Sequence, residues 1–156
     1  MEFQIRPAKP QDFPAIYGLI LALADFEKAP NEVDVTPEGL QADWSAGRFQ
    51  VWVAEADGQI RGMALGFWRY STWKGPTYHL EDLIVDAPFR GAGMGRALLR
   101  TLAEFALAQG AHRLHWEVLD WNQPAVKFYL ALGAEIASHW WPCRMDRQAM
   151  EHFAHG

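Results

Sequence analysis

The sequence predicts an α/β (α+β) fold, in which a mixed central sheet of six to seven strands is flanked by about four helices. Strand-like segments alternate with segments of helical spacing, an Asp57-Gly58 pair joins two of the strands, and a glycine-rich turn joins another strand to a helix. Because both hairpin and crossover connections occur, the sheet should be mixed. No repeat or linker divides the 156 residues, so one domain over residues 1–156 is expected.

The first half of the chain is expected to hold three strands and two helices. Ile16, Leu19 and Leu23 recur at helical spacing, which indicates a first helix that ends near Phe26. Thr36 is a suitable N-cap before a proline, where a second, short helix would start. Strands are expected over residues 3–6, 50–55 and 59–70, and the turn 56–58 between the last two favours a hairpin.

The second half is expected to hold two longer helices and four further strands. One helix should follow the glycine-rich turn and end before Gly110, and another should run from 123 to 132, capped by Asn122 and ended by Gly133. Strands are expected over about 77–85, 114–119, 135–139 and 142–146. The last two would form a terminal hairpin.

Composition excludes several classes of function. The formal net charge is −5 and no basic stripe is interleaved with aromatic residues, so nucleic acid is not an expected partner. Cys143 is the only cysteine, which rules out an intrachain disulfide and a cysteine-based zinc cluster. The six histidines lack paired metal-ligand spacing, so no metal is expected. The longest uncharged run, residues 13–24, is too short to span a bilayer, and no signal peptide is evident, so a cytoplasmic protein without a membrane partner is expected.

The glycine-rich turn at residues 90–95 favours the binding of an anion. It leads from a strand into a helix, where backbone N–H groups and the helix dipole together attract phosphate oxygens. The spacing fits neither a dinucleotide fingerprint nor a P-loop, since Arg96 and Ala97 stand where a P-loop carries Lys and Ser or Thr. On these residues alone, a purely structural turn is an equal alternative.

Three segments, LEDLIV at 80–85, RGAGMG at 90–95 and DWNQPAVKFY at 120–129, together resemble the GNAT superfamily of N-acetyltransferases. The run Arg90-Gly91-Ala92-Gly93-Met94-Gly95 is similar to its coenzyme A pyrophosphate loop. The runs at 80–85 (LEDLIV) and 120–129 (DWNQPAVKFY) are similar to segments of spermidine/spermine (diamine) and thialysine acetyltransferases. The resemblance covers nearly the whole chain, and it implies the GNAT fold and acetyl-coenzyme A as cosubstrate. The cofactor-binding residues that it implies are Leu83, Ile84, Val85, Arg90, Gly91, Ala92, Gly93, Met94, Gly95, Arg96, Asn122, Ala125, Phe128 and Tyr129.

The chemistry of acetyl transfer gives two of the matching residues a role. An alkylamine has a pKa near 10.4, so only about one molecule in 2,500 is neutral at pH 7, and a base should help to remove the proton. The resemblance implies that Glu81 accepts this proton, directly or through water, and that Tyr129 protonates the departing thiolate. A regular strand would point Glu81 and Asp82 to opposite faces. Solvated or arginine-paired carboxylates, and an ordinary core tyrosine, are the structural alternatives.

The identity of the amine stays open between a diamine, a polyamine and a lysine-like amino acid. The resemblance implies a substrate-binding set of Glu27, Trp73, Glu81 and Asp82. Ser71 stands where the polyamine enzymes carry an aspartate, which weakens the case for a tri- or tetracation.

Two other functions compete with this interpretation. One is acetylation of protein N-termini or lysines, which needs a wide groove, and the other is a coenzyme A-binding sensor without catalysis. Relatives are commonly homodimers, so a homodimer is expected, and Trp140 and Trp141 could contribute to its surface.

Overall fold

A computed structural model describes all 156 residues, which form two compact units, residues 1–117 and 118–156. The first unit holds the sheet, three α-helices and three short 3-10 helices, and the second holds two α-helices. No helix of the chain has the length and apolar composition that crossing a membrane requires.

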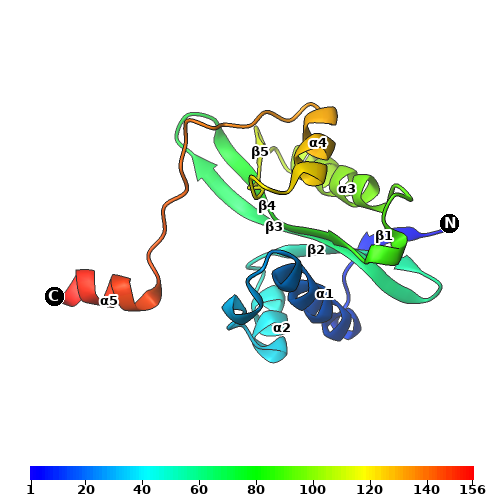
Figure 1. The fold of residues 1–156 in the computed structure, drawn as a ribbon, viewed down its shortest axis with the longest axis horizontal. Coiled ribbons are helices and arrows are strands. Elements are labelled where there is room, and N and C mark those ends of the chain that lie inside the picture. The colour runs from blue at the N-terminus through cyan, green and yellow to red at the C-terminus, as the bar shows by residue number, and fades with distance from the viewer. The chain divides into compact units, whose positions relative to one another are not determined.

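The first unit is built on a five-stranded sheet with the order β1-β2-β3-β4-β5 (Figure 1). Neighbouring strands are antiparallel from β1 to β4, whereas β4 and β5 are parallel. The mixed sheet is therefore confirmed, with five strands rather than six or seven. The strands are β1 (Gln4–Pro7), β2 (Gln50–Ala56), β3 (Gln59–Ser71), β4 (Gly75–Val85) and β5 (Leu114–His115).

The hairpin between β2 and β3 turns where the sequence predicted it. Ala56 pairs with Gln59, and the two residues between them have positive φ angles, 52° at Asp57 and 70° at Gly58. Two successive left-handed residues are the mark of a type I′ turn, whose twist matches that of the strands.

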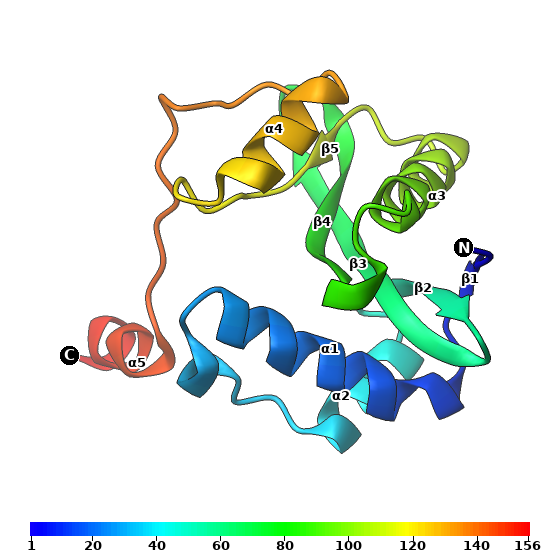
Figure 2. The same ribbon diagram turned by 45° about the vertical axis from the view of Figure 1, so that its right-hand side comes forward.

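Helices cover both faces of the sheet (Figure 2). One face carries α1 (Phe13–Phe26) and α2 (Pro37–Ser45), and α3 (Met94–Ala108) covers the other. Buried apolar side chains of α1 and α2 meet those of three strands in one cluster. On the α3 side, the ring of Phe105 lies 4.9 Å from Trp52 and 5.6 Å from Tyr78. The 3-10 helices are Pro10–Asp12, Pro30–Glu32 and Ala87–Phe89.

The second unit holds α4 (Gln123–Ala131) and α5 (Arg147–His155). The predicted start of α4 is confirmed, because Asn122 Oδ1 accepts a hydrogen bond from the Ala125 amide at 3.4 Å. The sequence analysis did not predict α5, although its N-cap Asp146 accepts from the Ala149 amide at 2.8 Å.

The predicted terminal hairpin at 135–139 and 142–146 does not form. The amides of Ser138 and Trp140 are used in local turns, to Ile136 O and Ala137 O. Pro142 has no amide to give to a ladder. The strand predicted over 114–119 is likewise limited to Leu114–His115.

Candidate active site

A β-bulge in β4 shapes the acidic part of the candidate site. Asp82 pairs with Leu65 and Leu80 pairs with Gly66, so Glu81 is one extra residue between two ladder pairs. The bulge interrupts the alternation of side chains, because two residues of β4 oppose one position of β3. The predicted opposite orientation of Glu81 and Asp82 assumed a regular strand and is therefore wrong.

Both carboxylates belong to the α1 and α2 side of the sheet. Asp82 is directly opposite Leu65, a member of the core cluster under these helices, and residues in direct register share a face. Glu81 Oε2 lies 3.0 Å from His79 Nε2. The His79 ring packs against the ring of Phe67, its register partner, with centroids 4.9 Å apart and the ring planes tilted by 44°. The side chains of Glu81 and Asp82 therefore lie near each other on this face of the sheet.

Glu27, which follows the last residue of α1, is the third carboxylate of this region, because its charge acts on Asp82. Partial burial raises the pKa of Glu27, and the negative charge of Glu81 raises it further. Burial likewise raises the pKa of Asp82 to about 7, with added repulsion from Glu81 and Glu27. The hydrogen bond from His79 instead lowers the pKa of Glu81. The sequence-predicted set Glu27, Glu81 and Asp82 is therefore brought together, as one electrostatic cluster.

The glycine turn has the backbone that an anion-binding loop requires. Gly91 and Gly93 have φ angles of 81° and 86°, which favour glycine, and Gly93 is the N-cap of α3 with no side-chain cap bond. A Cβ at either glycine would meet no atom within 4 Å, so the loop has open space in front of it. The first-turn amides of α3, including those of Met94, Gly95 and Arg96, have no side-chain acceptor and fit a pyrophosphate.

Arg90 braces this loop against the end of β4. Its Nε donates to Val85 O at 2.9 Å, and its guanidinium lies 5.6 Å from the ring centroid of Phe26, at the end of α1. Arg90 was predicted to bind the cosubstrate, and here its side chain holds the strand end and the loop together. Ala92, next to it in the loop, is exposed.

The outer edge of β4 is open over most of its length. Only Tyr78 and His79 pair with β5, whereas β4 continues to Val85 with β3 as its one partner. Alternate backbone groups of residues 80–85, including those of Leu83, face this edge and are therefore available to an extended ligand. This edge leads directly toward the glycine turn.

Trp73 lies in the turn between β3 and β4 and is 78% exposed. Ser71 Oγ accepts hydrogen bonds from the amides of Trp73 at 3.2 Å and Lys74 at 3.1 Å. The Ser71 hydroxyl therefore organises this turn.

The remaining predicted residues belong to the second unit. Asn122 and Ala125 form the N-terminal cap of α4, as described above. Phe128 and Tyr129 lie in the same helix with ring centroids 5.3 Å apart. The structure contains no group of three or more side chains suited to a metal ion.

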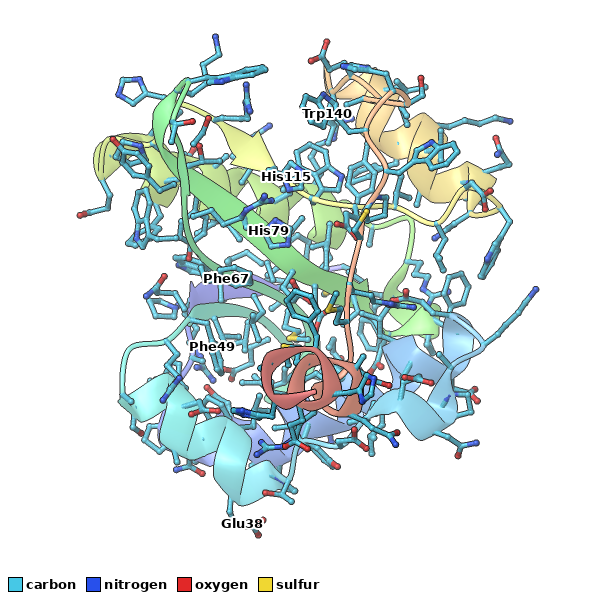
Figure 3. The ribbon with its side chains drawn as sticks, turned by 90° about the vertical axis from the view of Figure 1, so that its left-hand side faces the viewer. Glu38, Phe49, Phe67, His79, His115 and Trp140 are labelled. Atoms are coloured by element: carbon cyan, nitrogen blue, oxygen red, sulfur yellow. The ribbon has the colours of Figure 1, made fainter.

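Two histidines and an arginine next to Glu81 were missed by the sequence analysis. His79 and His115 lie side by side (Figure 3), with their Nδ1 atoms 2.9 Å apart, and Arg69 reaches His115 Nδ1 at 2.6 Å. The sequence separation of 36 residues concealed the pair, which exists only because β4 and β5 are in parallel register. The His79-Leu80-Glu81 spacing was the available signal, since residues two apart share a face of a strand.

Known proteins resemble this chain in sequence and in fold. The family described as "Acetyltransferase (GNAT) family" matches residues 18–134. Thialysine N-epsilon-acetyltransferase of Bos taurus is 37% identical over 163 residues, which cover 96% of each chain. Spermidine/spermine N(1)-acetyltransferase-like protein 1 of Homo sapiens is 29% identical over 160 residues, 95% of this chain and 23% of that protein.

The fold is likewise shared with a solved structure. The integron cassette protein VCH_CASS6 of V. cholerae superposes with a TM-score of 0.80 at 21% identity, over 100% of this chain and 99% of that one. The family match covers three quarters of the chain, and it includes the glycine turn and the bulged strand. The chain therefore belongs to the acetyltransferase (GNAT) family and is an N-acetyltransferase.

Proposed function

We propose that this protein transfers the acetyl group of acetyl-coenzyme A to the primary amine of a small molecule, namely a lysine-like amino acid or a short diamine. The observation that carries the proposal is the cluster of Glu27, Glu81 and Asp82, in which burial and the repulsion of the other two carboxylates raise the pKa of Asp82 to about 7. A cationic amine would relieve this repulsion. The thialysine acetyltransferase relatives favour an amine of lysine type.

The glycine turn and the open edge of β4 would bind the cosubstrate. The turn offers amides to the pyrophosphate, and the edge offers main-chain N–H groups of Leu83 or Val85 to the pantetheine arm. One such N–H would polarise the thioester carbonyl, as an oxyanion contact does. The open space before Gly91 and Gly93 supports this assignment.

The proposed catalytic residues divide the proton transfers between them. Glu81 takes one proton from the bound ammonium, and the neutral nitrogen then attacks the thioester carbon. As the new C–N bond forms, the C–S bond breaks, and Tyr129 gives its proton to the thiolate to form free coenzyme A. The second proton that the nitrogen loses on becoming an amide restores the Tyr129 phenol, and the third stays on the amide. Asp82 and Glu27 hold the substrate by charge, and Trp73 borders its entrance.

We propose that residues 1–156 act as one catalytic domain. The family match from 18 to 134 supports this, because it runs across the boundary between the two compact units. A homodimer in the cytoplasm completes the proposal, supported by Trp141, which is 86% exposed. Light scattering after gel filtration tests the dimer.

A thiol-release assay tests reaction and substrate class together. The protein is incubated with acetyl-coenzyme A and one amine at a time: thialysine, lysine, ornithine, putrescine, spermidine and peptides with a free N-terminus. We expect the largest kcat/KM with a lysine-like amino acid or diamine. Binding of the cosubstrate without thiol release from any amine would contradict the proposal, and preference for peptides would favour the protein-acetylating alternative.

Glu81→Gln is the variant that tests the base. It should lower kcat/KM by about a hundredfold or more, with the greatest loss at low pH, where little amine is already neutral. Glu38→Gln, an exposed glutamate in the first turn of α2, is the matched control and should match the wild type. Equal loss by Glu81→Gln across pH 6 to 10 would assign Glu81 a structural role.

A further inference from the structure

The end of α1 connects the acidic cluster with the glycine turn. Phe26 is the last residue of α1, and Glu27 follows it as the C-cap. The charge of Glu27 acts on Asp82 of β4, where it raises the pKa of that carboxyl. The guanidinium of Arg90, which begins the glycine turn, lies 5.6 Å from the centroid of the Phe26 ring. Two successive residues therefore interact with the two parts of the proposed site.

Backbone hydrogen bonds fix these two residues relative to each other. The Lys28 amide donates to Asp25 O at 3.0 Å. The Ala29 amide donates to Ala24 O at 2.9 Å. These two bonds form a Schellman motif, which closes a helix through one residue in the left-handed region. Lys28 is that residue, with a φ angle of 61°, although glycine is usual there. The last helical residue and its C-cap therefore move as one unit.

The Arg90 side chain is placed by a hydrogen bond as well as by the ring. Its Nε donates to Val85 O at 2.9 Å, at the end of the strand that carries Asp82. A guanidinium within about 6 Å of an aromatic centroid is attracted by the electron-rich face of the ring. Because Arg90 leads directly into Gly91, its contact with Phe26 depends on the backbone conformation of the turn.

The glycine turn is the partner whose backbone has more freedom. Residues 90–93 are exposed, and Gly91 and Gly93 have no Cβ to restrict them. A pyrophosphate bound to the amides of the turn would hold this backbone in one conformation. The contact between Arg90 and Phe26 would then persist, and it would hold the end of α1 as well. A ligand that orders a segment lowers the cost of binding a second ligand that needs the same order.

We propose that Phe26 is a positioning residue that couples the binding of acetyl-coenzyme A at the glycine turn to the binding of the amine at Glu27. This inference rests on the proposed function, because it takes the turn as the cosubstrate site and the acidic cluster as the amine site. Cosubstrate on the turn holds Arg90 against the ring of Phe26, and the helix end then holds Glu27 near Asp82. By linkage, the amine strengthens the binding of the cosubstrate by the same factor.

The size of this coupling follows from the strength of one cation–π contact. At an exposed site, such a contact changes an equilibrium constant by about two- to fivefold. Arg90 is exposed and Phe26 is 42% exposed, so this range applies to the pair. The same exposure means that a substitution of Phe26 leaves the buried core unchanged. We therefore expect its effect in ligand binding rather than in folding.

Calorimetry on the full-length protein tests the coupling without turnover. Thialysine, and in a second series putrescine, is titrated into the protein alone and into protein saturated with coenzyme A, which has no acetyl group to transfer. We expect coenzyme A to lower the wild-type Kd for the amine about two- to fivefold. Phe26→Leu keeps an apolar side chain but has no ring face, so its two Kd values should be equal. Phe26→Tyr keeps the ring and should retain the wild-type ratio.

Two other phenylalanines provide matched controls. Phe153→Leu changes a ring of α5 that is 79% exposed, and it should leave both Kd values unchanged. Phe89→Leu changes a ring just before the same turn, which lies 4.7 Å from the guanidinium of Arg61 on β3. It should retain the wild-type ratio of the two Kd values. An equal loss of coupling in Phe89→Leu and Phe26→Leu would overturn the specific role of Phe26.

The outcomes separate the coupling from the proposed function. A wild type that binds both ligands with equal Kd values for the amine, or a Phe26→Leu variant with the wild-type ratio, would overturn the coupling and leave the proposed function standing. A wild type that binds neither ligand would overturn both.

Hydrogen exchange adds a test that needs no amine. Coenzyme A should slow the exchange of the Lys28 and Ala29 amides, which close the end of α1, in the wild type but not in Phe26→Leu. Exchange of these wild-type amides that is equal with and without bound coenzyme A would overturn the coupling.

Discussion

Asp82→Asn should stabilise this protein in a pH-dependent way, because the native fold holds the Asp82 carboxyl at an energetic cost. Its pKa rises from 3.8 to about 7 on folding, and burial and the charges of Glu81 and Glu27 are the causes. Three pH units at about 1.36 kcal/mol each give a cost of about 4 kcal/mol once the group is ionised. Asparagine has the same shape and none of this cost.

The direction of this pH dependence follows from the protonation of Asp82 in the native and unfolded states. Between pH 3.8 and about 7 the native protein holds a proton on Asp82 that the unfolded chain has lost, so wild-type stability falls as the pH rises through this window. The stabilisation by Asp82→Asn should therefore be small at pH 4, grow by about 2 kcal/mol between pH 5 and pH 7, and level off at about 4 kcal/mol above pH 8.

Urea unfolding followed by tryptophan fluorescence at pH 5, 6.5 and 8 measures this difference. Asp34→Asn, an exposed aspartate in the loop before α2, is the control and should show no such trend. A gain that is equal at all three pH values, or a loss of stability at pH 8, would refute the reasoning. The same variant should bind the amine more weakly, as expected where a site is kept at the expense of stability.

Three other changes have defined outcomes. Gly66→Ala should destabilise the fold by about 2 to 4 kcal/mol in urea unfolding, because the new Cβ would lie 2.8 Å from a backbone oxygen. Gly18 has open space around it, so Gly18→Ala should stabilise the fold by about 1 kcal/mol. Equal effects of the two variants would contradict this reasoning. Asp12→Asn should lower the free energy of unfolding by about 3 kcal/mol at pH 7, because the ion pair with Arg6, which lowers the pKa of this buried carboxyl, is lost. The difference from the wild type should shrink as the pH falls below about 4, where the wild-type carboxyl becomes protonated. Tyr129→Phe should reduce kcat about a hundredfold with unchanged cosubstrate affinity by calorimetry, and a variant with full turnover would remove Tyr129 from the mechanism.

Local signals in the sequence predicted the fold well. Thr36, Asn122 and the Asp57-Gly58 turn act within a few residues of themselves, and the structure confirms all three. The glycine turn is of the same kind, because φ angles near 80° at Gly91 and Gly93 are a property of the backbone itself.

Features that depend on pairing between distant segments were not predictable in the same way. The bulge at Glu81 follows from the register of β4 on β3, and simple alternation therefore misplaced Asp82. The His79–His115 pair follows from the parallel register of β4 and β5. At the end of the chain, Pro142 and local turns removed the donors that a predicted hairpin needed.

The open edge of β4 has a consequence for handling the protein. A strand edge with free amides and carbonyls can add a strand from any other chain, and this is a common start of aggregation. A ligand that occupies the edge would protect it and would also stabilise the fold by mass action, by about 2.7 kcal/mol at a hundredfold excess over its dissociation constant. The backbone groups that we propose as the binding edge for the cosubstrate thus also make the unliganded enzyme prone to aggregation, and purification with coenzyme A present should improve its recovery.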